Sequence, residues 1–274
     1  MKKYIFLVII LVSALYFLFN QNTPVRIELL RIGTECEYPP NNWEESEATS
    51  SNVPLANEKN SYAEGYDIQI AKVVAEKLGA RLEVKKIAWQ ELIPALQRRE
   101  IDAIFSGMLD TDERKKFISF SETYDCIRTE YAMVVREDSK FSKAKRLNDF
   151  YGAVVTGQEG TTLDTLVEQI PGVIHVKATD TVEHLFEKLL NRDIDAIILN
   201  VDSGEIYEKV YPELMMIRFP RGQGFKLNFT GVCAGVNKKD TNLLNKINDV
   251  ISGLSKRDRQ RIMDRTLSRE WHNL

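Results

Sequence analysis

The 274-residue chain has few cysteines and histidines, and this limits the chemistry open to it. Its three cysteines and three histidines are scattered, without the close spacing of a metal site or a nucleophile–base pair. We therefore expect no metal, no cofactor and no catalytic residue. Cys36, Cys126 and Cys233 leave two alternatives open, namely one disulfide with a spare thiol or three buried thiols.

The chain also lacks an excess of charge of either sign. It has 37 basic and 40 acidic residues, a net charge of −3, and no basic stripe interleaved with aromatic residues. A nucleic-acid-binding surface is therefore not expected. The hydrophobic content of 43% is sufficient for one large domain or two smaller ones.

One long apolar run occurs, at the N-terminus. Lys2 and Lys3 precede apolar residues 4–19, a pattern typical of an export signal. The run is slightly shorter than the roughly 20 residues that span a bilayer, and no clear small-residue cleavage site or lipoprotein cysteine follows it. We expect residues 1–24 to be a signal peptide or an N-terminal membrane anchor. The exported protein would then act in the periplasm or at the outer face of the cytoplasmic membrane, either released or tethered.

The central stretch of the remaining chain is residues 101–124, IDAIFSGMLDTDERKKFISFSETY. Its apolar start predicts a buried strand that ends at Ser106 and Gly107, and helical spacing resumes at 111–117. Asp110 and Glu113 have the spacing of a capping pair at the start of that helix. Strand, turn and helix would surround a small hollow with backbone amides, beside an arginine one turn into the helix. Such an arrangement favours a small anionic group.

Alternating patterns predict an α/β chain. Strands are expected at residues 29–34, 82–84, 131–135, 153–156, 173–176 and 229–236, and helices at 67–79, 90–98, 161–169, 181–190, 242–254 and 256–263. Asp67 is the expected N-cap of the first helix and Gly79 its C-terminal stop. Residues 35–62 are too many for an ordinary connection, which predicts a functional loop or partial disorder. Tyr38 and Trp43 in this stretch are large flat groups suited to covering a ligand.

A hexapeptide is repeated, REIDAI at 99–104 and RDIDAI at 192–197, each entering a strand after an amphipathic helix. One interpretation is chance similarity between two common helix–strand joints. The favoured one is two α/β lobes of like architecture. Ligands bind at the C-terminal ends of such strands, so two facing lobes would form a cleft. We expect residues 25–134 plus 230–274 to form lobe 1 and residues 135–229 to form lobe 2.

Five motifs in order resemble the bacterial extracellular solute-binding proteins of family 3, the polar amino-acid receptors of ABC importers. The motifs are GTECEYPPNNW (33–43), EGYDIQIAKVVAEKLG (64–79), WQELIPALQRREIDAIFSGM (89–108), TDERKKFISFSETY (111–124) and GQEGTT (157–162). This resemblance covers nearly the whole chain after the N-terminal segment. It implies an α/β, two-lobed periplasmic-binding-protein fold of type II, with two α/β domains joined by a two-strand hinge.

The resemblance also implies a ligand site between the lobes. In it, an aromatic side chain stacks on the ligand, and strand-end and helix-start donors from both lobes hold the α-carboxylate. The implied residues are Tyr38 for stacking and Ser106, Gly107, Arg114, Thr161 and Thr162 for the carboxylate.

Two positions depart from the family pattern. Asn200 stands where an acidic residue usually takes the α-ammonium, and Leu109 replaces a usual Ser or Thr. An amide at position 200 cannot form the charge-assisted hydrogen bond that a carboxylate makes with an ammonium group, and such a bond is about twice as strong as a neutral one. Either Asp202 or Glu35 compensates, or the ligand is not a plain α-amino acid. Glu35 and Glu37, close to Tyr38 in the sequence, favour a cationic amino acid as the ligand. The amide at position 200 argues against naming a single ligand.

The expected function is that of a monomeric solute-binding protein which captures a polar amino acid, a cationic one included, or a related small carboxylate. Lobe closure would trap the ligand before transfer to permease and ATPase subunits. One alternative is a cyclohexadienyl-dehydratase-like enzyme on the same fold, with Glu35 and Asp202 as the carboxyl groups in the cleft. Another is a ligand-sensing module without transport.

Overall fold

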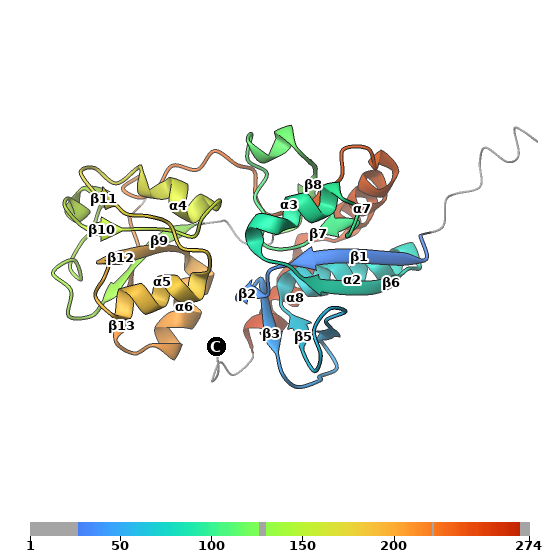
Figure 1. The fold of residues 1–274 in the computed structure, drawn as a ribbon, viewed down its shortest axis with the longest axis horizontal. Helices are drawn as coiled ribbons and strands as arrows, with labels where there is room; N and C mark the ends of the chain where they lie inside the picture. Colours follow the sequence, from blue (N-terminus) through green and yellow to red (C-terminus); the bar gives the residue numbers. More distant parts are fainter. Residues whose placement is uncertain (1–26, 126–129, 221, 269–274) are drawn as a thin grey trace, which may run out of the picture.

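The computed structural model describes residues 27–125, 130–220 and 222–268, which form two lobes, each built on a five-stranded sheet (Figure 1). The predicted signal peptide or anchor and Cys126 lie outside these ranges. Within them, no helix combines the length and the apolar character needed to cross a membrane.

The first sheet has the strand order β6-β1-β7-β14-β8. Its strands are β1 (Leu29–Thr34), β6 (Arg81–Lys86), β7 (Ala103–Ile104), β8 (Ser119–Thr123) and β14 (Cys233–Val236). β1 runs parallel to β6 and β7, whereas β14 is antiparallel to β7 and β8. Helices α2 (Tyr66–Leu78), α7 (Thr241–Gly253) and α8 (Lys256–Leu267) share one apolar cluster with this sheet, and α3 (Trp89–Gln97) lies over a second one.

The second sheet repeats this order as β11-β10-β12-β9-β13. Its strands are β9 (Tyr131–Arg136), β10 (Val154–Val155), β11 (Ile174–His175), β12 (Ala196–Asn200) and β13 (Leu214–Ile217). β10 is parallel to β11 and β12, whereas β9 is antiparallel to its two neighbours, β12 and β13. Helices α4 (Thr162–Val167), α5 (Val182–Leu190) and α6 (Val201–Val210) belong to this lobe, as does the short 3₁₀ helix η2 (Leu147–Phe150). The shared strand order confirms the predicted two-lobed α/β fold.

The chain crosses between the sheets twice, once between β8 and β9 and once between β13 and β14. The expected division after residue 134 falls inside β9, whose residues 131–136 pair with β12 and β13 of the second sheet. The first crossing therefore precedes Tyr131. After the second crossing, α7 and α8 pack against the first lobe, as predicted (red in Figure 1).

The two repeated hexapeptides have the same structural role. Asp102 Oδ2 accepts a hydrogen bond of 2.9 Å from the backbone N–H of Arg31, at the middle of β1. Asp195 Oδ2 likewise accepts a 2.9 Å bond from the N–H of Val154, at the start of β10. Each aspartate thus ties the third parallel strand of its lobe to the first. The repeat reflects equivalent joints in two like lobes.

Residues 35–62 form a long connection, as expected, but it is not irregular throughout. Short segments within this stretch and at its end form a small antiparallel sheet, ordered β2 (Glu37–Tyr38), β3 (Asn42–Glu45), β5 (Tyr62–Glu64) and β4 (Val53–Pro54). Trp43, expected as a ligand cover, is buried in β3 at 4% exposure. Strands this short, in a polar sequence, show too little alternation of apolar and polar residues to be recognised.

The first and third predicted helices of lobe 1 differ in detail. Gly65, not Asp67, is the N-cap of α2. A side chain does not fit at position 65, because a Cβ there would lie 2.3 Å from the Asn41 carbonyl oxygen. Gly79 ends α2 with φ of +66°, as predicted. The helix expected at 111–117 shortens to the 3₁₀ helix η1 (Arg114–Lys116), without the predicted capping pair. Asp110 instead binds the N–H and hydroxyl of Thr230.

Candidate functional site

Two neighbouring cavities lie between the lobes and share four lining residues. These are Tyr38, Gly107, Leu109 and Tyr131. The smaller cavity has a volume of about 40 Å³ and the larger about 280 Å³. All ten residues expected in the ligand site line one cavity or both. Glu35, Ser106, Arg114, Thr161 and Thr162 line the smaller, Asn200 and Asp202 the larger, and Tyr38, Gly107 and Leu109 both.

Arg114 brings a buried positive charge to the smaller cavity. Its guanidinium donates to the Leu109 carbonyl at 3.0 Å and, across the cleft, to the Gly160 carbonyl at 3.1 Å. It also lies 4.9 Å from the ring centroid of Trp89. Burial lowers its pKa to about 10, so it stays charged at neutral pH. Among the described residues it forms no ion pair, whereas its neighbours Lys115 and Lys116 face solvent.

Ser106 and Gly107 end β7, but their polar groups already have partners. The Ser106 hydroxyl accepts a 3.0 Å bond from the backbone N–H of Glu35. The N–H of Gly107, which was expected to face a carboxylate, donates to Asp67 Oδ2 at 2.6 Å. Gly107 adopts φ of +59°, a conformation that favours glycine. The Arg114 guanidinium from η1, rather than the Gly107 amide, is therefore the first-lobe donor expected to meet a carboxylate in the smaller cavity.

Asp67 is a structural hub that sequence reasoning mistook for a helix cap. Its side chain is fully buried and accepts bonds from the Gly107 N–H, the Asn42 amide at 2.9 Å and the Tyr124 hydroxyl at 2.6 Å. Burial raises its pKa to about 6, although these three bonds oppose the shift. Asp67 thus connects α2, the small sheet and the Gly107 turn. The motif EGYDIQI contains it, but nothing local identifies its partners.

The second lobe reaches the smaller cavity through the turn before α4. Thr161 is the N-cap of α4, and its hydroxyl accepts from the Leu163 N–H at 3.1 Å and donates to the Gln158 carbonyl at 2.7 Å. Thr162 is the first residue of the helix. Gln158, regarded from sequence as part of a turn, donates through Nε2 to Glu35 Oε1 across the cleft. Burial raises the pKa of Glu35 to about 8, and nearby Glu37 adds to this.

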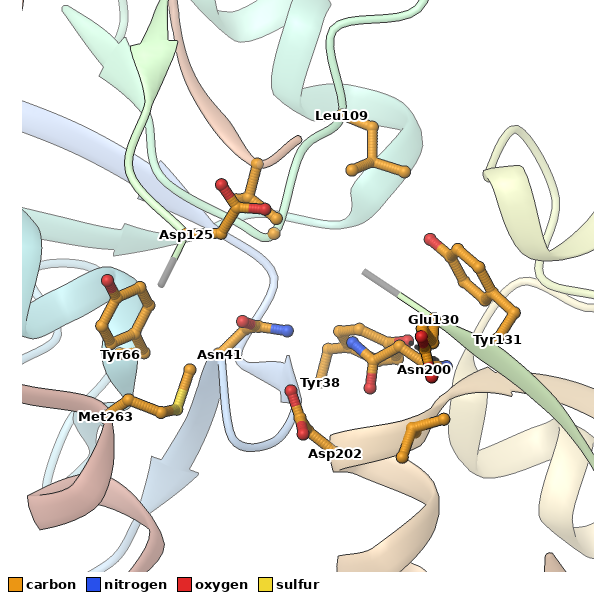
Figure 2. A pocket seen from close by; sticks show the side chains of 13 residues that line it. Tyr38, Asn41, Tyr66, Leu109, Asp125, Glu130, Tyr131, Asn200, Asp202 and Met263 are labelled. Atoms are coloured by element: carbon orange, nitrogen blue, oxygen red, sulfur yellow. Dashed lines mark hydrogen bonds between the residues drawn. The ribbon is translucent and has the colours of Figure 1, made fainter. Parts of the chain in front are cut away.

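The larger cavity is lined by the start of α6 and by carboxylates of both lobes (Figure 2). Asn200 is the N-cap of α6, with Oδ1 accepting from the Ser203 N–H at 2.7 Å, and its own N–H donates to the Tyr38 hydroxyl at 3.3 Å. Burial, followed by the charge of Glu205, raises the pKa of Asp202. No helix was expected at residues 201–210, so the sequence analysis missed both α6 and the capping role of Asn200.

Several further lining residues were not singled out from sequence. They are Asn41, Tyr66, Trp89, Asp125, Glu130, Tyr131 and Met263. Cys36 and Cys233 are buried free thiols, and burial raises the pKa of each to about 12. No group of His, Cys, Asp and Glu side chains suited to a metal ion occurs in the described part of the chain. The site therefore consists of hydrogen-bonding groups, aromatic rings and separated charges, which suit reversible binding of a small zwitterion.

Comparisons with known proteins agree with this architecture. Residues 30–268 match the model of the bacterial extracellular solute-binding proteins, family 3. The chain is 26% identical over 224 residues to the arginine-binding extracellular protein ArtP of Bacillus subtilis, covering 81% of this chain and 79% of that protein. It matches the crystal structure of the substrate binding protein of an amino acid ABC transporter with a TM-score of 0.74 and 28% identity, over 88% of this chain and 100% of that one.

A second solved structure supports the same assignment. Holo ArgBP from T. maritima matches with a TM-score of 0.68 and 30% identity, covering 84% of this chain and 92% of that chain. The family resemblance carried by the five sequence motifs is thereby confirmed. The chain belongs to the bacterial extracellular solute-binding proteins, family 3.

Proposed function

We propose that this protein is the extracytoplasmic receptor of an ABC importer and that it binds the carboxylate of an amino acid at Arg114. In this proposal the protein is an exported monomer that hands its ligand to permease and ATPase subunits. Residues 1–24 serve as its signal peptide or membrane anchor, in the periplasm or at the outer face of the cytoplasmic membrane. Membership of an extracellular solute-binding family supports this placement.

The observation that carries the proposal is the environment of Arg114. Arg114 is buried at 8% exposure, and the hydrogen bonds that its guanidinium donates within the described residues go to uncharged carbonyl groups, of Leu109 and Gly160. A buried cation without a carboxylate partner is costly, and a ligand carboxylate would supply the missing charge as a bidentate partner. Thr161 and Thr162 line the same cavity from the other lobe.

Glu35 favours a ligand with a cationic side chain. Its carboxyl group lines the same cavity as Arg114, and burial raises its pKa to about 8. A guanidinium or ammonium group beside it would restore the ionised form and gain a charge-assisted hydrogen bond. The names of relatives support this choice, because ArtP and ArgBP are both described as arginine-binding.

Capture would occur by lobe closure. The first lobe contributes Arg114 and Glu35, and the second contributes Thr161 and Gln158. A ligand held by both sets of groups binds the closed arrangement better than an open one, so it shifts the equilibrium between them. In this proposal the two crossings of the chain are the hinge.

The experiment that tests the proposal is a thermal-shift titration of the purified full-length protein with the twenty amino acids. A ligand at about 100 times its dissociation constant stabilises the folded state by roughly 2.7 kcal/mol. We expect a shift with a cationic amino acid, and we expect Arg114→Ala to abolish it. Lys116→Ala is the matched control, because it removes a positive charge from the exposed face of η1. If no amino acid shifts the protein, or if Arg114→Ala responds like the control, the carboxylate site is wrong.

A further inference from the structure

The larger cavity contains a polar group that no protein partner uses. Asn41 is only 7% exposed and lines this cavity, and no described residue forms a hydrogen bond with its side-chain amide. Its backbone is fixed, because its N–H donates to the Tyr38 carbonyl at 2.9 Å and its carbonyl accepts from the Asp67 N–H at 2.8 Å. Figure 2 shows the amide pointing into the open space, with Asp202 below it and Asp125 above it in this view. A buried amide held in this way is ready to bind a ligand.

The cavity is also acidic and larger than an ammonium group requires. Asp125, Glu130 and Asp202 line it, and the described lining residues include no basic side chain. Its volume of about 280 Å³ compares with roughly 30 Å³ for one water molecule. Such surroundings favour a positively charged group that carries several additional atoms.

The side chain expected to bind a free α-ammonium group, that of Asn200, is poorly suited to doing so. Asn200 has no negative charge, and its Oδ1 already accepts a bond from the Ser203 N–H. The Nδ2 group that remains is a donor, and a donor does not bind an ammonium group. The larger cavity begins at this position and extends past Tyr38, which also lines the smaller one.

From this juxtaposition we infer that the preferred ligand is a dipeptide rather than a free amino acid. The inference rests on the proposed function, since the C-terminal carboxylate binds at Arg114 in the smaller cavity. The α-nitrogen of that residue is then a peptide N–H, which needs no carboxylate at position 200. The N-terminal residue occupies the larger cavity, where its ammonium group faces Asp202 and its carbonyl oxygen accepts from the Asn41 amide.

Other extensions of the ligand fit this cavity less well. A second carboxylate on the nitrogen substituent would lie in the same cavity as Asp202 and be repelled by its charge. An uncharged acyl group would fill the volume but bring no additional positive charge to Asp202. An N-terminal ammonium satisfies both the size and the charge of the cavity.

The test is isothermal titration calorimetry of the full-length protein with matched pairs of ligands, namely free arginine, lysine, histidine and glutamine against the corresponding glycyl dipeptides. For the side chain that binds best, we expect the dipeptide to bind about tenfold more tightly than the free amino acid, as expected for one added hydrogen bond to a charged group. Acetylation of the dipeptide ammonium is expected to remove this advantage.

Variants separate this inference from the proposed function. Asp202→Asn and Asn41→Ala should weaken dipeptide binding about tenfold. Asp112→Asn is the control, because the Asp112 side chain is 98% exposed. If free amino acids bind as tightly as their dipeptides, the inference is wrong and the proposed function stands. If neither class binds, both are wrong.

Discussion

At the scale of single residues, two buried carboxyl groups have raised pKa values for the same reason and with different consequences. Burial raises the pKa of Asp67 to about 6 and that of Glu35 to about 8. Asp67 accepts three hydrogen bonds and positions the Gly107 turn, whereas Glu35 has one side-chain bond from Gln158 and faces the smaller cavity. The carboxyl group of Asp67 therefore has a structural role, whereas the carboxyl group of Glu35 remains available to a ligand.

The pKa of Glu35 predicts how the unliganded protein responds to pH. In the folded state its pKa is about 8, against a reference value of 4.5, so the folded state retains a proton that the unfolded state has lost. The contribution of Glu35 to the free energy of unfolding should therefore be greatest below pH 4.5 and fall as the pH rises towards 8, by at most about 1.4 kcal/mol per pH unit. We expect Glu35→Gln to flatten this fall, since glutamine stays neutral and still accepts from Gln158.

Urea denaturation at pH 5, 6, 7 and 8 measures this effect, with Glu47→Gln as the control on the exposed part of the small-sheet segment. The stability advantage of Glu35→Gln over the wild type should grow with pH, while the control remains parallel to the wild type. A constant difference between Glu35→Gln and the wild type across this range would contradict the assignment.

At the scale of elements, the N-termini of the second-lobe helices hold much of the site. Thr161, Thr181 and Asn200 are the N-caps of α4, α5 and α6, and in each the side chain accepts a backbone N–H of the first turn. Two of these caps also line the cavities. The same side chains thus stabilise helices and present the second lobe to a ligand.

Asn200 allows the two roles to be separated by substitution. Asp caps a helix as well as Asn does, and its charge is favourable at a helix N-terminus. We therefore expect Asn200→Asp to leave stability unchanged and to strengthen the binding of a free α-amino acid by about 1 kcal/mol through a charge-assisted bond to the ammonium. Asn200→Ala should instead cost about 1 kcal/mol of stability through loss of the cap.

Thermal unfolding and calorimetry on the two variants distinguish these outcomes. Thr181→Ala serves as the comparison for a lost cap, since Thr181 lines neither cavity. If Asn200→Asp binds free amino acids no better than the wild type, the side chain at position 200 does not face the ligand nitrogen.

At the scale of the whole molecule, hydrogen bonds between the lobes surround the two cavities. Gly160 accepts from Trp89 Nε1 and from Arg114, each at 3.1 Å, and Gln158 donates to Glu35. On the other side, the Ser203 hydroxyl donates to the Pro39 carbonyl, next to the Tyr38–Asn200 contact. These bonds exist only while the lobes are in contact, so each contributes to the free energy of closure.

The Trp89 bond provides a test of this coupling. Phenylalanine retains a ring beside the Arg114 guanidinium but lacks the N–H that binds Gly160. Loss of one neutral hydrogen bond is worth about 1 kcal/mol, so Trp89→Phe should weaken ligand binding about fivefold by favouring the open arrangement. Small-angle scattering should show a larger radius of gyration for this variant at subsaturating ligand.

Tyr151→Phe is the matched control, because Tyr151 is 75% exposed and lines neither cavity. Equal affinities for Trp89→Phe, the control and the wild type would mean that the Gly160 bond does not contribute to closure.

The regular elements and the duplication of the fold follow from the amino-acid pattern alone. β1 and helices α3, α5 and α7 lie at the predicted positions to within about a residue, because buried positions repeat with the period of the element. Family motifs indicated ten positions that all line the two cavities. Local pattern failed at the small sheet, at α6 and at the shortened helix η1, where distant residues determine the backbone.

The hydrogen bonds that connect the site depend on how the lobes are arranged in space. Glu35 and Gln158 are 123 residues apart in the chain, Tyr38 and Asn200 are 162 apart, and Gly107 and Asp67 are 40 apart. No periodicity relates such positions, because their contacts depend on how two lobes face one another. For the same reason, the unpartnered Asn41 amide and the acidic cavity around it could not be predicted from the sequence. The groups that line a cavity between the lobes meet only after the chain has crossed twice between them.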